Sequence, residues 1–157
     1  SGEVEYEISD YILETEYVDD FKILQLSDTH IANKDNQDYQ FDFIQSTIDE
    51  ADPNMIVITG DLFTFADKAT AIRYFDFFEG QNIPWTVTFG NHDEQCYFSI
   101  DWVTTYLNNL SKQEGSHLLF VDNLGDKVTG NCNFAINLMK NNAIFEQLIL
   151  IDSNRYY

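Results

Sequence analysis

The chain has 157 residues, a length that fits one domain with a hydrophobic core of its own. Hydrophobic residues make up 44% and aromatic residues 15% of it, which excludes a disordered chain, and no apolar run approaches the ~20 residues of a membrane span. Its 27 acidic against 8 basic residues give a formal charge of -19, which argues against nucleic acids and anionic membranes as partners and favours cations.

The N-terminus and the cysteines carry little information about the cellular compartment. The first residues, Ser1-Gly2-Glu3, include no initiator Met and no signal-peptide pattern, so we interpret the terminus as processed or engineered and leave the localisation unknown. Cys96 and Cys132 lack the spacing of a zinc or redox motif. We expect two ordinary thiols, which could pair only if the fold brings them together.

The first predicted elements are strands and one helix. Alternating apolar and polar residues predict a leading strand or hairpin within residues 3–17. The apolar run Phe21–Leu26 predicts the next strand. A stripe of apolar side chains at helical spacing follows, and Pro53 blocks its continuation. The members of this stripe are Phe41, Ile44, Ile48 and Ala51.

The same strand and helix alternation continues to residue 121. Met55–Ile58 and Trp85–Phe89 predict buried strands, and Leu118–Val121 predicts a fourth short one. Two helical stripes lie between them, the first closed by Gly80 and the second capped by Ser99. These stripes are Ala69, Ile72, Phe75 and Phe78, and then Ile100, Val103, Leu107 and Leu110.

Two apolar stretches near the C-terminus, within residues 134–138 and 148–151, predict antiparallel strands because their connection is too short for a helical crossover. The predicted fold class is therefore α/β, with a parallel βαβ sheet flanked by helices and additional antiparallel strands. Residues 1–157 contain no linker or internal repeat, which indicates a single domain.

Three short polar cassettes directly follow the three longer strands: Asp28-Thr29-His30, Gly60-Asp61 and Gly90-Asn91-His92-Asp93. Parallel strands deliver such residues to one edge of a sheet, where a shared metal centre can form. Asp28 and His30 are spaced to chelate one ion, and the two carboxylate oxygens of Asp61 could bridge two ions.

The third cassette adds a ligand and a proton donor. Asn91 offers an amide oxygen to the second ion. His92 is predicted to protonate a leaving group, and Asp93 is predicted to orient it. Mixed donors favour Mn, Fe or Zn, and two such ions lower the pKa of a bridging water and clamp a phosphoryl group. The predicted reaction is hydrolysis of a phosphomonoester or phosphodiester by a metal-bridging hydroxide.

The three cassettes together resemble the first three motifs of the calcineurin-like metallophosphoesterases. The resemblance implies that Asp28 and His30 bind the first of two divalent or trivalent metal ions, Asp61 bridges both, and Asn91 binds the second. It also implies that His92 assists departure of the leaving group. Asp52-Pro53 and Leu150–Ser153 are further similar to the branch related to purple acid phosphatases.

The chain departs from the family pattern in its later part. The family completes its site with later histidines, including a Gly-His-x-His motif that this sequence does not contain, and we interpret His117 as a loop or strand-edge histidine. Thr64 stands where many relatives carry a carboxylate, which leaves Asp93 or Glu94 to polarise His92. We expect a C-terminally incomplete domain with weak activity of its own and an exposed sheet edge through which it could associate.

Two alternatives remain open at this point. The chain could be a catalytically incomplete scaffold that acts as a cation-binding or protein-binding module. Asp28 and Asp61 could instead cap helices, and Asn91 could serve a tight turn, although these roles do not account for the pairing with His30. Tyr97 and Phe98 are the aromatic residues expected near a substrate.

Overall fold

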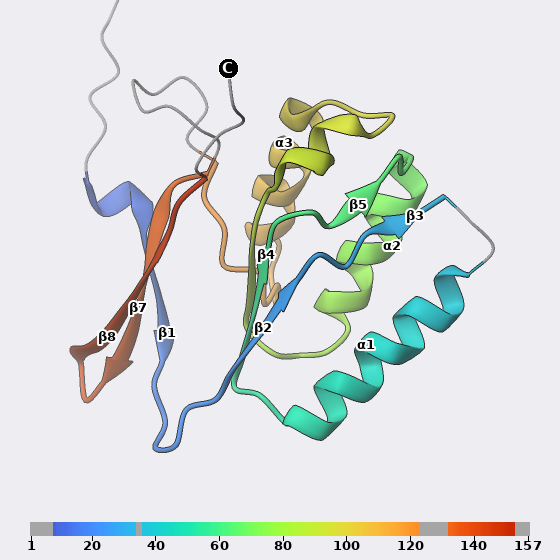
Figure 1. Ribbon diagram of the computed structural model, residues 1–157. Coiled ribbons are helices and arrows are strands. Elements are labelled where there is room, and N and C mark those ends of the chain that lie inside the picture. The colour runs from blue at the N-terminus through green and yellow to red at the C-terminus, as the bar shows by residue number, and fades with distance from the viewer. Residues whose placement is uncertain (1–7, 34–35, 123–131, 153–157) are drawn as a thin grey trace, which may run out of the picture.

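The computed structural model describes residues 8–33, 36–122 and 132–152 of the chain (Figure 1). Two three-stranded sheets and a small two-stranded one make up its β-structure in these residues. The strands are β1 (Ile12–Glu16), β2 (Ile23–Ser27), β3 (Ile31–Ala32), β4 (Met55–Thr59), β5 (Phe63–Thr64), β6 (Trp85–Thr88), β7 (Phe134–Lys140) and β8 (Ala143–Leu150). The helices are the 3₁₀ turns η1 (Ile8–Tyr11) and η2 (Asn91–Gln95) and the α-helices α1 (Gln37–Ala51), α2 (Lys68–Glu79) and α3 (Ile100–Ser111).

The central sheet has the order β2-β4-β6, and all its strands are parallel. Ser27 pairs with Thr59, and Thr59 pairs with Thr88, so the three strands end side by side. The first four residues of β4 are all buried, as expected for a strand covered on both faces. This register places the residues that follow the three strands at one edge of the sheet, as the sequence predicts.

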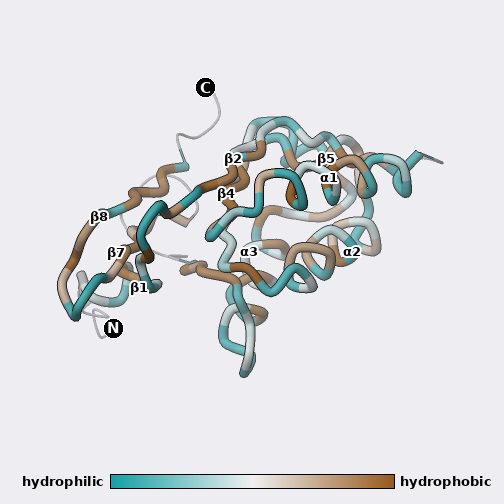
Figure 2. The backbone as a smooth tube through the Cα atoms, turned by 90° about the horizontal axis from the view of Figure 1, so that it is seen from below, coloured by the Kyte–Doolittle hydropathy of each residue, from teal (hydrophilic) through white to brown (hydrophobic). Residues whose placement is uncertain are grey.

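Three α-helices lie on one side of the central sheet, and the sheet β1-β7-β8 lies on the other (Figures 1 and 2). Tyr74, Phe75 and Phe78 of α2 are fully buried, and Trp85 of β6 packs against the last two. Burial of such large aromatic side chains contributes about 2–3 kcal/mol each, before the entropy of ordering them is counted. The α/β fold class is confirmed.

Details of the predicted elements need correction. The buried face of α2 is formed by Thr70, Ala71, Tyr74, Phe75 and Phe78, so the predicted Ala69 and Ile72 are not among its buried residues. Leu118–Val121 is not a strand, because after one bridge between Leu118 and Trp85 the chain diverges and Phe120 packs on Phe134. The α1 and α3 stripes are confirmed in large part, with Ser99 capping α3.

The second sheet combines the two ends of the described chain. The predicted antiparallel pairing of the C-terminal strands is confirmed for β7 and β8, and β1 joins β7 in parallel. The predicted leading strand is confirmed over Ile12–Glu16, Ile8 belongs to η1, and Val4 and Tyr6 lie outside the described residues. Strand β8 leaves Ile144, Phe145 and Ile149 exposed. Among the described residues, no helix has the length and apolar character that a membrane span needs.

Candidate metal centre

The first two cassettes are held side by side by a ladder that continues beyond the central strands. The backbone N–H of Asp28 donates to Gly60 O at 3.2 Å, that of His30 to Asp61 O at 3.1 Å, and that of Ile31 to Leu62 O at 2.9 Å. Strands β3 and β5 then pair in parallel from Ile31 and Phe63 onward. The two connections therefore follow the same path, and their side chains meet at the sheet edge.

The backbone conformation of these residues is unusual. Asp28, His30 and Asp61 have φ angles of 54°, 47° and 51°, in the left-handed region that Asp and His tolerate better than most residues with a side chain. Gly60 precedes Asp61 with a φ of 69°. Such conformations cost of order 1 kcal/mol or more each and are common at functional sites. Here they turn three potential ligands out of the strand direction within two short connections.

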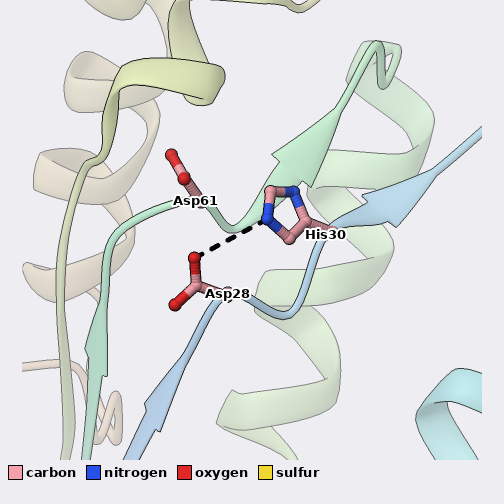
Figure 3. A group of neighbouring side chains, drawn as sticks. All are labelled: Asp28, His30 and Asp61. Carbon is pink, nitrogen blue, oxygen red and sulfur yellow. Dashed lines mark ion pairs between the residues drawn. The ribbon is translucent and has the colours of Figure 1, made fainter.

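The side chains of Asp28, His30 and Asp61 form a compact cluster (Figure 3). One potential ligand atom from each lies within 4.8 Å of the others, and His30 Nε2 is 3.7 Å from Asp28 Oδ1. Asp28 is exposed and the other two are partly buried, so the cluster is open to solvent. Two carboxylates and one imidazole are a donor set that fits a divalent transition metal.

The second nitrogen of His30 has a partner that the sequence did not reveal. His30 Nδ1 lies 2.8 Å from Thr64 Oγ1 in β5. When the threonine oxygen accepts a hydrogen from Nδ1, the lone pair of the neutral ring is at Nε2, on the side of Asp28. The residue that replaces a family carboxylate therefore supports a predicted metal ligand rather than His92.

The third cassette is attached directly to Asp61. The backbone N–H of His92 donates to Asp61 Oδ1 at 2.9 Å, and the rings of His30 and His92 are 5.5 Å apart, edge to face. Asn91 is exposed and lies between Gly90 and His92, which both contact Asp61. The structure thus brings the three cassettes together, while ligation by Asn91 remains a prediction.

Asp93 fixes the third cassette through hydrogen bonds to two backbone N–H groups. Its side chain is almost fully buried, with Oδ1 accepting from Phe63 N at 3.0 Å and Oδ2 from Gly90 N at 2.8 Å. Burial raises the pKa of this carboxyl to about 6, against the opposing effect of these amides. The carboxylate therefore ties η2 to β5. The nitrogen Nδ1 of His92 lies instead 2.9 Å from Gln95 Oε1, a contact not foreseen in the sequence.

Similarity to known proteins agrees with this geometry. A family model described as calcineurin-like phosphoesterase matches residues 21–155. The chain belongs to this family. An uncharacterized protein of Schizosaccharomyces pombe is 28% identical over 144 residues, covering 79% of this chain. The chain spans only 27% of that relative's length.

The surroundings of the Asp28, His30 and Asp61 cluster test the predictions about nearby aromatic residues. A groove of about 320 Å³ is lined by residues 26–29 on one side and by α1 on the other, with Asp28, Tyr39 and Phe43 among its lining residues. Tyr97 is 72% exposed, whereas Phe98 is 8% exposed and packs against Phe63 in the core. The prediction that both aromatics face a substrate is therefore wrong for Phe98.

His117 and the two cysteines lie outside the cluster of Asp28, His30 and Asp61. The backbone of His117 bonds to Trp85 and to the Glu79 carboxylate, which confirms its place at a strand edge. Cys96 is partly buried and Cys132 is buried, and neither forms a disulfide within the described residues.

Proposed function

We propose that this protein is a metal-dependent phosphoester hydrolase whose site is built around Asp28, His30 and Asp61. The observation that carries the proposal is the convergence of these three side chains within 4.8 Å at the ends of two parallel strands. His92 lies beside the same cluster and supplies a group able to transfer protons. Capping or turn roles alone give no reason for the imidazoles and carboxylates to meet.

The residues that would hold metal follow from this placement. We assign Asp28 and His30 to one ion, Asp61 to a bridging position and Asn91 to a second ion, with Mn, Fe or Zn as the preferred elements. When bound, such ions supply an acidified water and neutralise charge on the phosphoryl group. The three clustered ligand atoms occupy only part of the four to six positions that these metals use. The remaining ligands are proposed to come from other parts of the full-length protein.

The other side chains are proposed to position the ligands or to transfer a proton. Thr64 holds His30 with Nε2 available, and Asp61 holds the turn that carries His92 through the 2.9 Å bond to its backbone N–H. His92 is proposed to donate a proton to the leaving oxygen as the phosphorus–oxygen bond breaks. Asp93 is assigned a positioning role, since both of its oxygens accept from backbone N–H groups.

Within the family, we propose that the domain belongs to the branch related to purple acid phosphatases. Asp52-Pro53 before β4 and Leu150–Ser153 near the end of the chain are the residues that support this placement. A phylogeny built on full-length family members tests it. Grouping with another branch would contradict it.

The test of the proposed function uses the full-length protein and the substitution Asp61→Asn. The amide oxygen of asparagine can still accept from His92 N, so the turn is preserved while the charge is lost. Asp42→Asn, at an exposed position on α1, removes the same charge away from the cluster and serves as control.

Metal content after purification and hydrolysis of an aryl phosphate with added Mn²⁺ or Zn²⁺ are measured for all three proteins. We expect the wild type and Asp42→Asn to bind metal and turn over substrate. Asp61→Asn should lose metal and about 100-fold or more of the rate, because metal ions supply several kcal/mol of transition-state stabilisation. A wild-type protein that binds no metal and hydrolyses no phosphoester would exclude the function and favour a scaffold.

A further inference from the structure

The turn that carries His92 also carries its side-chain partner. Helix η2 spans Asn91–Gln95 and is a 3₁₀ helix, in which residues three apart eclipse one another. His92 and Gln95 are three apart, and Nδ1 of the imidazole lies 2.9 Å from Oε1 of the amide. Asp93 and Glu94 project in other directions from such a turn. The local helix type therefore selects Gln95 as the partner of the ring.

This contact favours one of the two tautomers of the His92 ring. A carbonyl oxygen can only accept, so a hydrogen bond between these two atoms makes Nδ1 of His92 the donor to Gln95 Oε1. In the neutral ring the lone pair is then at Nε2, and in the protonated ring Nε2 holds the proton that can leave. The Gln95 side chain thus presents one defined nitrogen for proton exchange.

The backbone on both sides of Gln95 is anchored by hydrogen bonds. Before it, Asp93 is bonded to backbone N–H groups of Phe63 and Gly90 at 3.0 and 2.8 Å. After it, Tyr97 N donates to Ala66 O at 2.9 Å. Both anchors join η2 to β5 and the residues that follow it. The backbone around residue 95 is therefore held on both sides in sequence, and from this position the Gln95 side chain reaches the ring of His92.

We propose that Gln95 is a positioning residue for proton transfer by His92, an inference that rests on the proposed hydrolase function. Water forms a bond to phosphorus, and the bond from phosphorus to the leaving oxygen breaks with its electron pair on that oxygen. The oxygen takes the Nε2 proton, and a proton from the attacking water, released to solvent, later restores the ring. Gln95 keeps Nδ1–H engaged throughout, so that Nε2 is always the donor.

The kinetic test compares two leaving groups in the full-length protein. A nitrophenolate leaves readily without a proton, whereas an alkoxide needs one, so loss of His92 positioning should harm alkyl phosphoesters selectively. Gln95→Met keeps the side-chain length but removes the acceptor, and Gln95→Glu restores an acceptor oxygen. Gln113→Met, at an exposed position after α3, is the matched control.

We expect Gln95→Met to lower kcat on the alkyl ester about tenfold or more, as loss of a supporting hydrogen bond typically does, and to change the nitrophenyl rate less than threefold. Gln95→Glu should recover most of the rate on the alkyl ester. Gln113→Met should leave the rates on both esters at the wild-type value. In a His92→Ala background, Gln95→Met should have no further effect. Equal losses on both esters, or a loss that persists without His92, would overturn the assignment.

A second measurement is independent of metal and turnover. In protein labelled with ¹⁵N-histidine, the ring shifts of neutral His92, assigned by their absence in His92→Ala, report which nitrogen is protonated. The wild type should show the Nδ1–H form, and Gln95→Met should shift the ring toward Nε2–H. An unchanged tautomer refutes the role of Gln95. If both proteins showed the expected tautomers but the wild type had no phosphoesterase activity, the result would refute the proposed function and leave the contact between Gln95 and His92 supported.

Discussion

The backbone of Gly90 lies directly against the carboxylate of Asp61. A β-carbon at position 90 would be 2.3 Å from Asp61 Oδ1 and 2.5 Å from Asp61 N, closer than β-carbons approach non-bonded atoms in proteins. The φ and ψ angles of Gly90 are -110° and -178°, an extended conformation open to any residue. Space, rather than backbone freedom, therefore requires glycine here, and this contact joins the second and third cassettes.

The substitution Gly90→Ala should separate these two cassettes. The new methyl group forces Asp61 or the η2 turn to move, at a cost of about 1–3 kcal/mol in the free energy of unfolding. Because Asp61 is a proposed metal ligand, Zn²⁺ or Mn²⁺ affinity should fall as well. Urea unfolding and calorimetric metal titration measure the two effects.

Gly80→Ala is the control for that experiment. Position 80 ends α2 in a right-handed helical conformation, and a β-carbon there would be 3.3 Å from Asp76 O. A small shift relieves this contact, so stability should change by less than about 1 kcal/mol and metal affinity should not change. Equal effects of the two substitutions would show that the Gly90 contact has no special importance.

The pH dependence of stability should carry a contribution from Asp93 with an unusual sign. Burial raises the pKa of its carboxyl to about 6 in the folded protein, above the ordinary value of 3.8. Between these values the folded state binds more protons than the unfolded state. The contribution of Asp93 to stability therefore decreases as the pH rises through this range, by at most about 1.4 kcal/mol per pH unit.

Comparison with Asp93→Asn isolates this contribution. The free energy of unfolding of wild type minus variant, measured by urea unfolding without added metal, should fall from pH 4.5 to about pH 6.5 and then become constant. The variant should be less stable than the wild type. The amide nitrogen of asparagine cannot accept a hydrogen bond, so one of the two backbone N–H groups that donate to Asp93 loses its acceptor. A difference that rises with pH would mean that the two backbone N–H groups lower the pKa of Asp93 below 3.8.

The contact between Thr64 and His30 should tune metal affinity. Thr64→Val keeps the side-chain shape but removes the oxygen 2.8 Å from His30 Nδ1. The freed ring can change tautomer or rotate, and supporting contacts of this kind are typically worth 10–100-fold in affinity. Calorimetric titration with Zn²⁺ should show a loss of about tenfold or more. Thr64→Ser should retain wild-type affinity, and a loss of equal size in Thr64→Ser would contradict the role of the hydroxyl.

Much of the fold was predictable because the signals are local and repeated. Fully apolar runs such as Met55–Ile58 identify central parallel strands, and helical spacing identifies α1 and α3. The parallel pairing of β1 with β7 depends on contacts between residues more than 100 positions apart, which no local pattern contains. For the same reason the sequence could not show that Leu118–Val121 leaves the sheet after one bridge.

The candidate site was predictable in its composition but not in its supporting contacts. Asp28, His30 and Asp61 follow strands whose ends must share an edge, so their meeting follows from the βαβ order. The partners Thr64 and Gln95 depend on the pairing of β3 with β5 and on the 3₁₀ geometry of η2. Neither feature has a distinctive sequence pattern, and Asp93, the more obvious candidate, has both oxygens bonded to backbone N–H groups.

Thr86 in β6 offers a test of the core that leaves the site untouched. Its side chain is fully buried, and within the described residues its hydroxyl oxygen has no hydrogen-bond partner. Burying a hydroxyl without a partner costs about 1–3 kcal/mol, and valine has the same shape without that oxygen. Thr86→Val should therefore stabilise the protein by about 1 kcal/mol, or about 2–4 °C in Tm.

Thr104→Val provides the matched comparison, because Thr104 is equally buried but its hydroxyl donates to Asp101 O at 3.2 Å. That variant should lose about 1 kcal/mol through the missing hydrogen bond, because valine and threonine have about the same helix propensity. Thermal unfolding of the two variants should thus move Tm in opposite directions, while Zn²⁺ affinity stays at the wild-type value in both. If Thr86→Val lowered Tm as Thr104→Val does, the Thr86 hydroxyl would have to be bonded to a buried water that the valine expels.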